Sequence, residues 1–63
     1  MKYRELVKII ENEGWQHVRT KGSHRIYQHD QKQGIVVLAP HSLGADVPVG
    51  ILRAVLKQAG IEQ

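Results

Sequence analysis

The spacing of the apolar residues changes twice along the chain, and this change constrains the fold more than any other feature of the sequence. Near the N-terminus, apolar side chains recur every three or four residues, as on one face of an amphipathic helix. The middle of the chain alternates polar and β-branched residues or runs continuously apolar, which is typical of strands. The helical spacing then returns before the C-terminus. In a chain of 63 residues, this pattern predicts a single α+β domain over residues 1–63 with a modest core.

Glycines and polar clusters divide the pattern into five predicted elements. These are a helix over Tyr3–Glu13 ended by Gly14, strands over Gln16–Lys21, His24–Gln28 and Ile35–Ala39, and a helix over Val49–Ala59 ended by Gly60. The Gly22-Ser23 pair predicts a tight hairpin between the first two strands. The unbroken apolar run of the third strand predicts burial on both faces. Asp46 is expected to cap the second helix, with Pro48 in its first turn.

A sheet of three sequential strands has one face to cover, and two amphipathic helices can both lie on that face. We therefore expect an α-β-β-β-α domain with a three-stranded antiparallel sheet and both helices on one side. This order is the layout of double-stranded-RNA-binding domains in a reduced form. A layout does not specify an activity, so the function has to be argued from individual residues.

The charge and composition narrow the classes of partner. Nine Lys and Arg residues against six Asp and Glu give a net charge of +3, which suits RNA, DNA or an acidic protein partner. The alternative is a solvated surface that is basic without a partner. With no cysteine, disulfides and thiolate metal sites are excluded. We expect a cytoplasmic protein that is not associated with a membrane, since no long apolar run is present. The sequence also has no glycine fingerprint for a nucleotide cofactor.

Among the four histidines, which are the side chains that titrate near neutral pH, His24 is the leading catalytic candidate. It follows Gly22-Ser23 at the start of a predicted strand and lies between Lys21 and Arg25 in the sequence. Flanking cations attract a phosphate and stabilise the charge that builds up during phosphoryl transfer. The alternative is a structural histidine at the edge of the core, because His24 shares its strand alternation with Ile26.

Other chemistries fit the sequence less well. A zinc site would have to be built from histidines whose spacing matches no common ligand pattern, namely His17, His24, His29 and His41. Serine catalysis is disfavoured because Ser23 and Ser42 each adjoin a histidine in sequence, and strand neighbours point to opposite faces. Glu11 and Glu13 lie two apart on a helix and do not face each other. Trp15 and Tyr27 are expected to pack in the core rather than to stack on bases.

Several short motifs, in their order and spacing, resemble the HicA family of toxins. The residues that carry the resemblance are Glu13-Gly14-Trp15, Gly22-Ser23-His24, Pro40-His41, Gly50-Ile51-Leu52 and Leu56-Lys57-Gln58-Ala59-Gly60-Ile61. Together they extend over almost the whole chain. The resemblance implies the toxin half of a type II toxin–antitoxin pair, with a double-stranded-RNA-binding-like fold. Such a toxin is a ribosome-independent mRNA interferase, and its partner is a HicB-type antitoxin that blocks the active site in an oligomeric complex.

The resemblance also implies roles for particular residues. The catalytic histidine of the family's glycine-serine-histidine motif falls on His24, and many members have a second histidine where this chain has Arg25. The residues expected to hold the RNA around His24 are Arg19, Lys21, Gly22, Ser23, Arg25 and His41, with His41 or a lysine as the proton donor. No metal or cofactor is implied. The alternatives are a non-catalytic RNA-binding or protein-interaction module of the same fold, and a purely structural partner protein.

Overall fold

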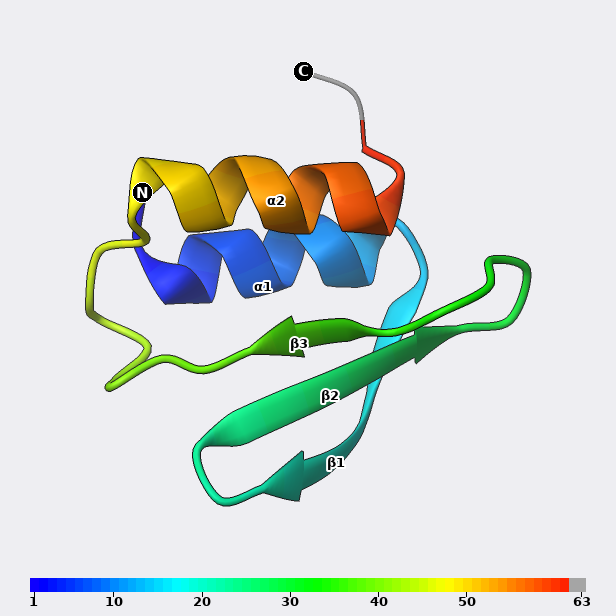
Figure 1. Ribbon diagram of the computed structural model, residues 1–63, viewed down its shortest axis with the longest axis horizontal. Coiled ribbons are helices and arrows are strands. Elements are labelled where there is room, and N and C mark those ends of the chain that lie inside the picture. Colours follow the sequence, from blue (N-terminus) through cyan, green and yellow to red (C-terminus); the bar gives the residue numbers. More distant parts are fainter. Residues whose placement is uncertain (62–63) are drawn as a thin grey trace.

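The structure, a computed structural model, describes residues 1–61 and has the element order predicted from the sequence (Figure 1). The elements are α1 (Tyr3–Asn12), β1 (Trp15–Lys21), β2 (His24–His29), β3 (Val36–Leu38) and α2 (Val49–Ala59). The three strands form one antiparallel sheet in the order β1-β2-β3. The α+β fold with an α-β-β-β-α order is thereby confirmed, and the bounds of α2 are those predicted.

Both helices lie along the same side of the sheet and run next to each other (Figure 1). Apolar residues of both helices, of all three strands and of the connection before α2 form the main core between these layers: Tyr3, Leu6, Ile10, Trp15, Tyr27, Val36, Leu38, Val47, Val55, Leu56 and Ala59. The face of the sheet that points towards the helices is called the inner face below, and the opposite face is called the outer face. No helix of the described chain covers the outer face.

Trp15 and Tyr27 are core residues, as predicted, with side chains 1% and 0% exposed. The indole Nε1–H of Trp15 donates a hydrogen bond of 3.1 Å to the carbonyl oxygen of Ala59 near the end of α2. Gly60 follows with φ of +73°, the left-handed conformation that ends the helix. The C-terminal end of α2 is therefore tied to the start of β1.

The third strand differs from its prediction in length and in burial. It contains only Val36–Leu38, and the side chains of Ile35 and Val37 are 43% and 40% exposed. Burial on both faces was therefore a wrong prediction. The helices cover only the inner face, where Val36 and Leu38 are buried, and nothing in the described chain covers Val37.

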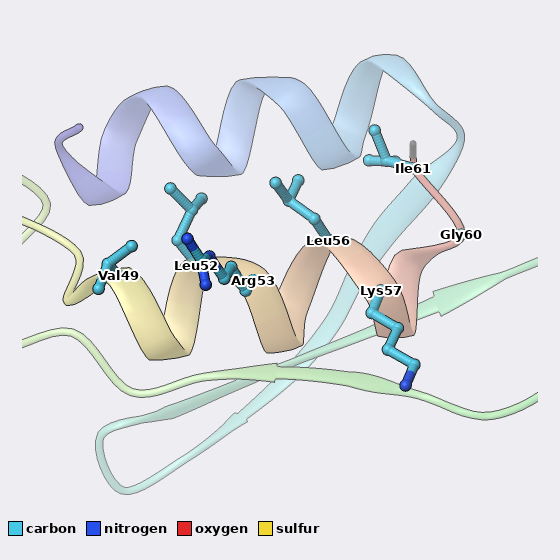
Figure 2. Close-up of a pocket in the computed structure, with 7 residues that line it drawn as sticks. All are labelled: Val49, Leu52, Arg53, Leu56, Lys57, Gly60 and Ile61. Atoms are coloured by element: carbon cyan, nitrogen blue, oxygen red, sulfur yellow. The ribbon is translucent and has the colours of Figure 1, made fainter. Parts of the chain in front are cut away.

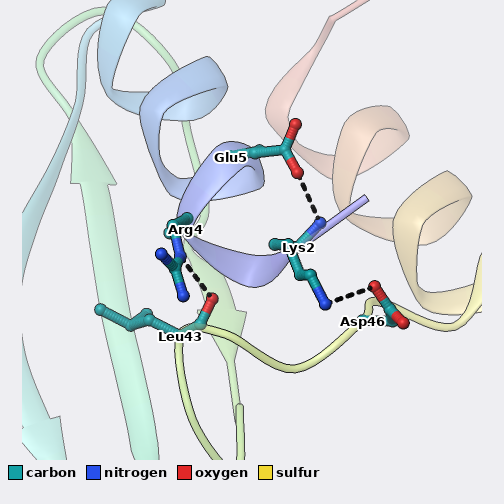
Figure 3. A network of polar contacts seen from close by, with 5 residues as sticks. All are labelled: Lys2, Arg4, Glu5, Leu43 and Asp46. Carbon is teal, nitrogen blue, oxygen red and sulfur yellow. Dashed lines mark hydrogen bonds and ion pairs between the residues drawn. The ribbon is translucent and has the colours of Figure 1, made fainter.

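The long connection between β3 and α2 is fastened to the start of α1. The backbone N–H of Arg4 donates to the Leu43 carbonyl at 3.0 Å, and the N–H of Val47 donates to the Met1 carbonyl at 2.8 Å. Asp46 forms an ion pair of 3.4 Å with Lys2 (Figure 3). Asp46 is therefore not the predicted helix cap. The N-cap of α2 is Pro48, which lies just before the helix rather than in its first turn.

Over residues 1–61, no helix combines the length and apolar character needed to cross a bilayer.

Candidate functional site

The β1–β2 hairpin presents His24 at the rim of the sheet. Its tight turn consists of Gly22 and Ser23, and Gly22 has φ of +61°, in the left-handed region that glycine enters without a steric penalty. His24 is the first residue of β2, and its side chain is exposed. His24 is therefore not a structural histidine at the edge of the main core. Ile26 does lie on the same face of β2 as His24, but this is the outer face of the sheet.

A β-bulge at Val18 decides which face of the sheet the end of β1 shares with His24. Alternation counted from the buried Trp15 would place Arg19 and Lys21 on the inner face. Between His17 and Arg19, however, the pairing register shifts by one residue. Bulges of this kind insert one extra residue and re-aim the side chains that follow. Arg19 and Lys21 consequently lie on the outer face.

The register after the bulge assembles a group of positive and titratable side chains on one face. Lys21 is directly opposite His24, and Arg19 is opposite Ile26. Because residues 24 and 26 share a face of β2, Arg19, Lys21 and His24 occupy the same outer face, and we call them the outer-face cluster. All three side chains are exposed to solvent.

Apolar side chains adjoin this cluster on the outer face. Ile26 is opposite Arg19 on one side and Val37 on the other. Ile26 is 8% exposed although it lies outside the main core, whereas Val37 is 40% exposed. No sequence pattern marks this apolar strip as part of a site, because both residues fit a strand of the core equally well.

Arg25 is separated from the outer-face cluster. It is opposite Thr20 and Leu38, and it alternates with the buried Tyr27 on the inner face. Burial raises the pKa of the Tyr27 hydroxyl above its ordinary value, and the positive charge of Arg25 opposes this rise. By distance and angle the buried Tyr27 hydroxyl has no hydrogen-bond partner among the described residues, although the Arg25 side chain lies near enough to interact with it and to lower its pKa. Arg25 is therefore a neighbour of Tyr27 rather than of the His24 ring.

Two of the four histidines are held by hydrogen bonds. His17 Nε2 lies 2.8 Å from Thr20 Oγ1, and its ring lies 5.2 Å from the ring of Tyr27. His29 Nδ1 accepts a bond of 2.9 Å from the Gln31 backbone N–H, so Nε2 donates to the Glu13 carbonyl at 2.8 Å. Neither His24 nor His41 forms a side-chain hydrogen bond within the described chain, so both rings are free for a ligand.

His41 lies in the connection that follows β3, and its side chain is exposed. Leu38 is opposite Arg25, so the chain leaves β3 at the end of the sheet where β2 begins. The connection containing His41 and the Gly22-Ser23 turn are at the same end of the molecule (Figure 1). Residues 1–61 contain no group of three potential metal ligands among His, Asp and Glu.

No curated protein matches the chain. A protein family described as the HicA toxin of bacterial toxin–antitoxin systems matches residues 3–61. The match includes both helices and the whole sheet, together with His24 and the hairpin turn. The chain therefore belongs to the HicA toxin family.

Proposed function

We propose that this toxin is an endoribonuclease that cleaves mRNA through His24. The observation that supports this best is the exposed imidazole of His24 directly opposite Lys21, on an open face of the sheet. Membership of a toxin family supports a role in a toxin–antitoxin pair, and RNA cleavage by the outer-face cluster is our inference. A toxin that acts on mRNA would work in the cytoplasm.

The reaction uses the nucleophile that RNA itself carries. The imidazole of His24 takes the proton from the ribose 2′-hydroxyl, and the 2′-oxygen attacks the adjacent phosphorus. The bond from phosphorus to the 5′-oxygen breaks, and the leaving oxygen receives a proton from a general acid. The products are one fragment with a 2′,3′-cyclic phosphate and one with a 5′-hydroxyl. The chain therefore has to hold the attacking 2′-oxygen, the phosphorus and the leaving 5′-oxygen in line. It also has to accept one proton and donate one.

Lys21 and Arg19 supply the positive charge on the side of the sheet where His24 works. A cation directly opposite the imidazole stabilises negative charge as it grows on the phosphate oxygens. The backbone of Gly22 and Ser23 lies beside them at the turn and can approach the phosphate closely. Arg25 would also bind the RNA. It would contact the strand from the inner face of the hairpin, away from the reacting phosphate. His41 is our candidate for the acid.

The direct test is cleavage of a labelled transcript by the purified chain and by a His24→Ala variant. Because His24 is exposed, we expect the variant to fold normally and to lose cleavage. A His17→Ala variant is the matched control and should retain cleavage. His17 is a β1 histidine that is hydrogen-bonded to Thr20. Full cleavage by the His24→Ala variant would overturn the proposal. Loss of activity on adding a chelator would indicate a metal-dependent route instead.

The partner of this reaction would be a HicB-type antitoxin in an oligomeric complex. Expression of the chain alone should stop growth, and coexpression of the antitoxin should restore it. The alternative function, a non-catalytic RNA-binding or protein-interaction module, predicts salt-dependent retention of RNA without fragments. The transcript assay distinguishes the two, because fragments with 5′-hydroxyl ends form only in the first case.

A further inference from the structure

A groove runs along α2 on the helical side of the molecule, and the proposed nuclease reaction makes no use of it. It has a volume of about 660 Å³ and is lined by Val49, Leu52, Arg53, Leu56, Lys57, Gly60 and Ile61. No residue of the sheet lines it. These seven residues are called the α2 groove below. The outer-face cluster, by contrast, lies on the face of the sheet that the helices leave open.

The lining follows the geometry of one helical stripe. Within α2 its positions recur at intervals of three and four, which places them on one face of the helix. Figure 2 shows Leu52 and Leu56 next to each other on this face, with Val49 and Ile61 at the two ends. Val49 is 65% exposed, the largest exposed fraction among the exposed large apolar side chains. The exposed aliphatic surface of the groove comes from Val49 and from the half-buried Leu52 and Ile61, whereas Leu56 is 4% exposed and belongs to the main core.

Two cations accompany the aliphatic stripe. Arg53 and Lys57 are one turn apart on α2, and both side chains are exposed. Neither forms an ion pair with a residue of the described chain. At the C-terminal end of the helix, the Ala59 carbonyl accepts hydrogen bonds from Trp15 Nε1 and from Lys32 Nζ at 3.1 and 3.0 Å. The negative end of the helix dipole is thereby partly neutralised, and the groove keeps a positive character.

We propose that the α2 groove binds an acidic amphipathic helix of a partner protein. The eleven residues of α2 extend over about 16 Å, the length of three helical turns. A partner helix with apolar residues at i, i+3, i+4 and i+7 would pack on Val49 and Leu52, with the buried Leu56 beneath them. Its flanking carboxylates would pair with Arg53 and Lys57. Nucleic acid is a poorer occupant, because the floor is aliphatic and its two cations are one turn apart on a single helix.

Binding of a partner helix to the α2 groove does not depend on the chemistry of His24. A partner helix in the α2 groove leaves the outer-face cluster accessible, since the two lie on different layers of the fold. Variants of the groove should therefore lose the partner helix and still cleave RNA. The reverse holds for the His24→Ala variant, which should bind the partner helix normally. Failure of one proposal can thus be told apart from failure of the other.

The test uses a synthetic helical peptide with leucines at i, i+3, i+4 and i+7 and glutamates at the flanking positions. It is titrated into the ¹⁵N-labelled full chain and followed by NMR. We expect shifts at the amides of Leu52, Leu56 and Ile61. A peptide with lysine in place of every glutamate should bind about tenfold more weakly or not at all. Shifts confined to the outer face, or none anywhere, would overturn the proposal.

Matched variants identify the binding surface. Val49→Asp and Arg53→Glu should each weaken peptide binding about tenfold, the first by removing an apolar contact and the second by reversing a charge. Ile51→Asp and Lys8→Glu are the controls, because Ile51 is an exposed α2 residue outside the groove and Lys8 is an exposed cation on α1. Equal binding by all four variants would contradict the proposal. So would self-association that Val49→Asp abolishes, because the occupant would then be a second copy.

Discussion

Lys21 lies directly opposite His24 across the two-residue turn of the β1–β2 hairpin, and the bulge at Val18 places this pair on the outer face. Without that extra residue, simple alternation from Trp15 would direct Lys21 towards the helices. The hydrogen bond between His17 and Thr20 is consistent with the same shift, since it joins residues on the inner face from either side of the bulge. The turn therefore pairs a base with a cation, and the bulge puts this pair on the accessible face.

This arrangement predicts unequal roles for the two cations next to His24 in the sequence. Lys21→Gln should lower the rate of RNA cleavage by at least about tenfold, because it removes a positive charge facing the reacting phosphate. Arg25→Gln should have a smaller effect on the rate, because Arg25 lies on the inner face beside Tyr27. Single-turnover cleavage of a short labelled RNA measures both effects. A larger loss of cleavage rate for Arg25→Gln would show that the cation opposite His24 is not the one that binds the reacting phosphate.

His41 can be tested as the general acid with a modified substrate. His41→Ala should slow cleavage of ordinary RNA, because the leaving 5′-oxygen then lacks a proton donor. Replacing that bridging oxygen with sulfur gives a leaving group that needs no proton. The His41→Ala variant and the unmodified chain should cleave this substrate at nearly equal rates. If the variant remains slow with the sulfur substrate, His41 has another role, such as binding the RNA.

The buried hydroxyl of Tyr27 predicts an effect on stability. Tyr27→Phe should raise the free energy of unfolding at pH 7 by about 1 kcal/mol, since a buried donor without a partner is costly. Chemical denaturation followed by circular dichroism measures this difference. Tyr3→Phe is the control, because Tyr3 is also buried in the core, at 6% exposure, and no unpaired hydroxyl is found there. A clear loss of stability in Tyr27→Phe would mean that the hydroxyl has a partner.

The same residue predicts how stability changes with pH. Burial raises the pKa of Tyr27 in the folded protein above the ordinary value of 10.0, so the folded state holds this proton more tightly than the unfolded state. The corresponding stability is fully present below pH 10 and is lost as the pH rises through the folded pKa. The melting temperature should therefore fall in alkaline solution. In Tyr27→Phe this fall should be smaller.

Two exposed glycines should respond to alanine in opposite directions. Gly22→Ala should reduce the free energy of unfolding by about 1 kcal/mol, because Gly22 has φ of +61° in the hairpin turn. Gly50→Ala should increase it by about 0.5 kcal/mol, since Gly50 lies in α2 and an added Cβ there meets nothing within 4 Å. Thermal melts of both variants provide the measurement. Equal signs would contradict the backbone conformation of the turn.

The periodicity of the sequence determined the elements and their order, because amphipathic spacing reflects which residues each element buries. It predicted α2 at its observed bounds, the hairpin turn at Gly22 and Ser23, and Trp15 and Tyr27 as core residues. It also singled out His24, since a histidine after a glycine turn and between cations is a local pattern. The helix bounds, the turn and the histidine motif are patterns of a few neighbouring residues, and size alone favours the core for the two aromatic side chains.

Only the tertiary structure decided which face of the sheet each strand side chain lies on and which strand residues the helices cover. The bulge at Val18 is a mismatch between two strands, so only their pairing reveals that Lys21 and His24 lie on the open outer face while Trp15 faces the helices. The exposure of Val37 depends on where the helices lie, and Asp46 pairs with Lys2, which is distant in sequence. Local propensity cannot predict such contacts, because their partners are brought together only when the chain folds.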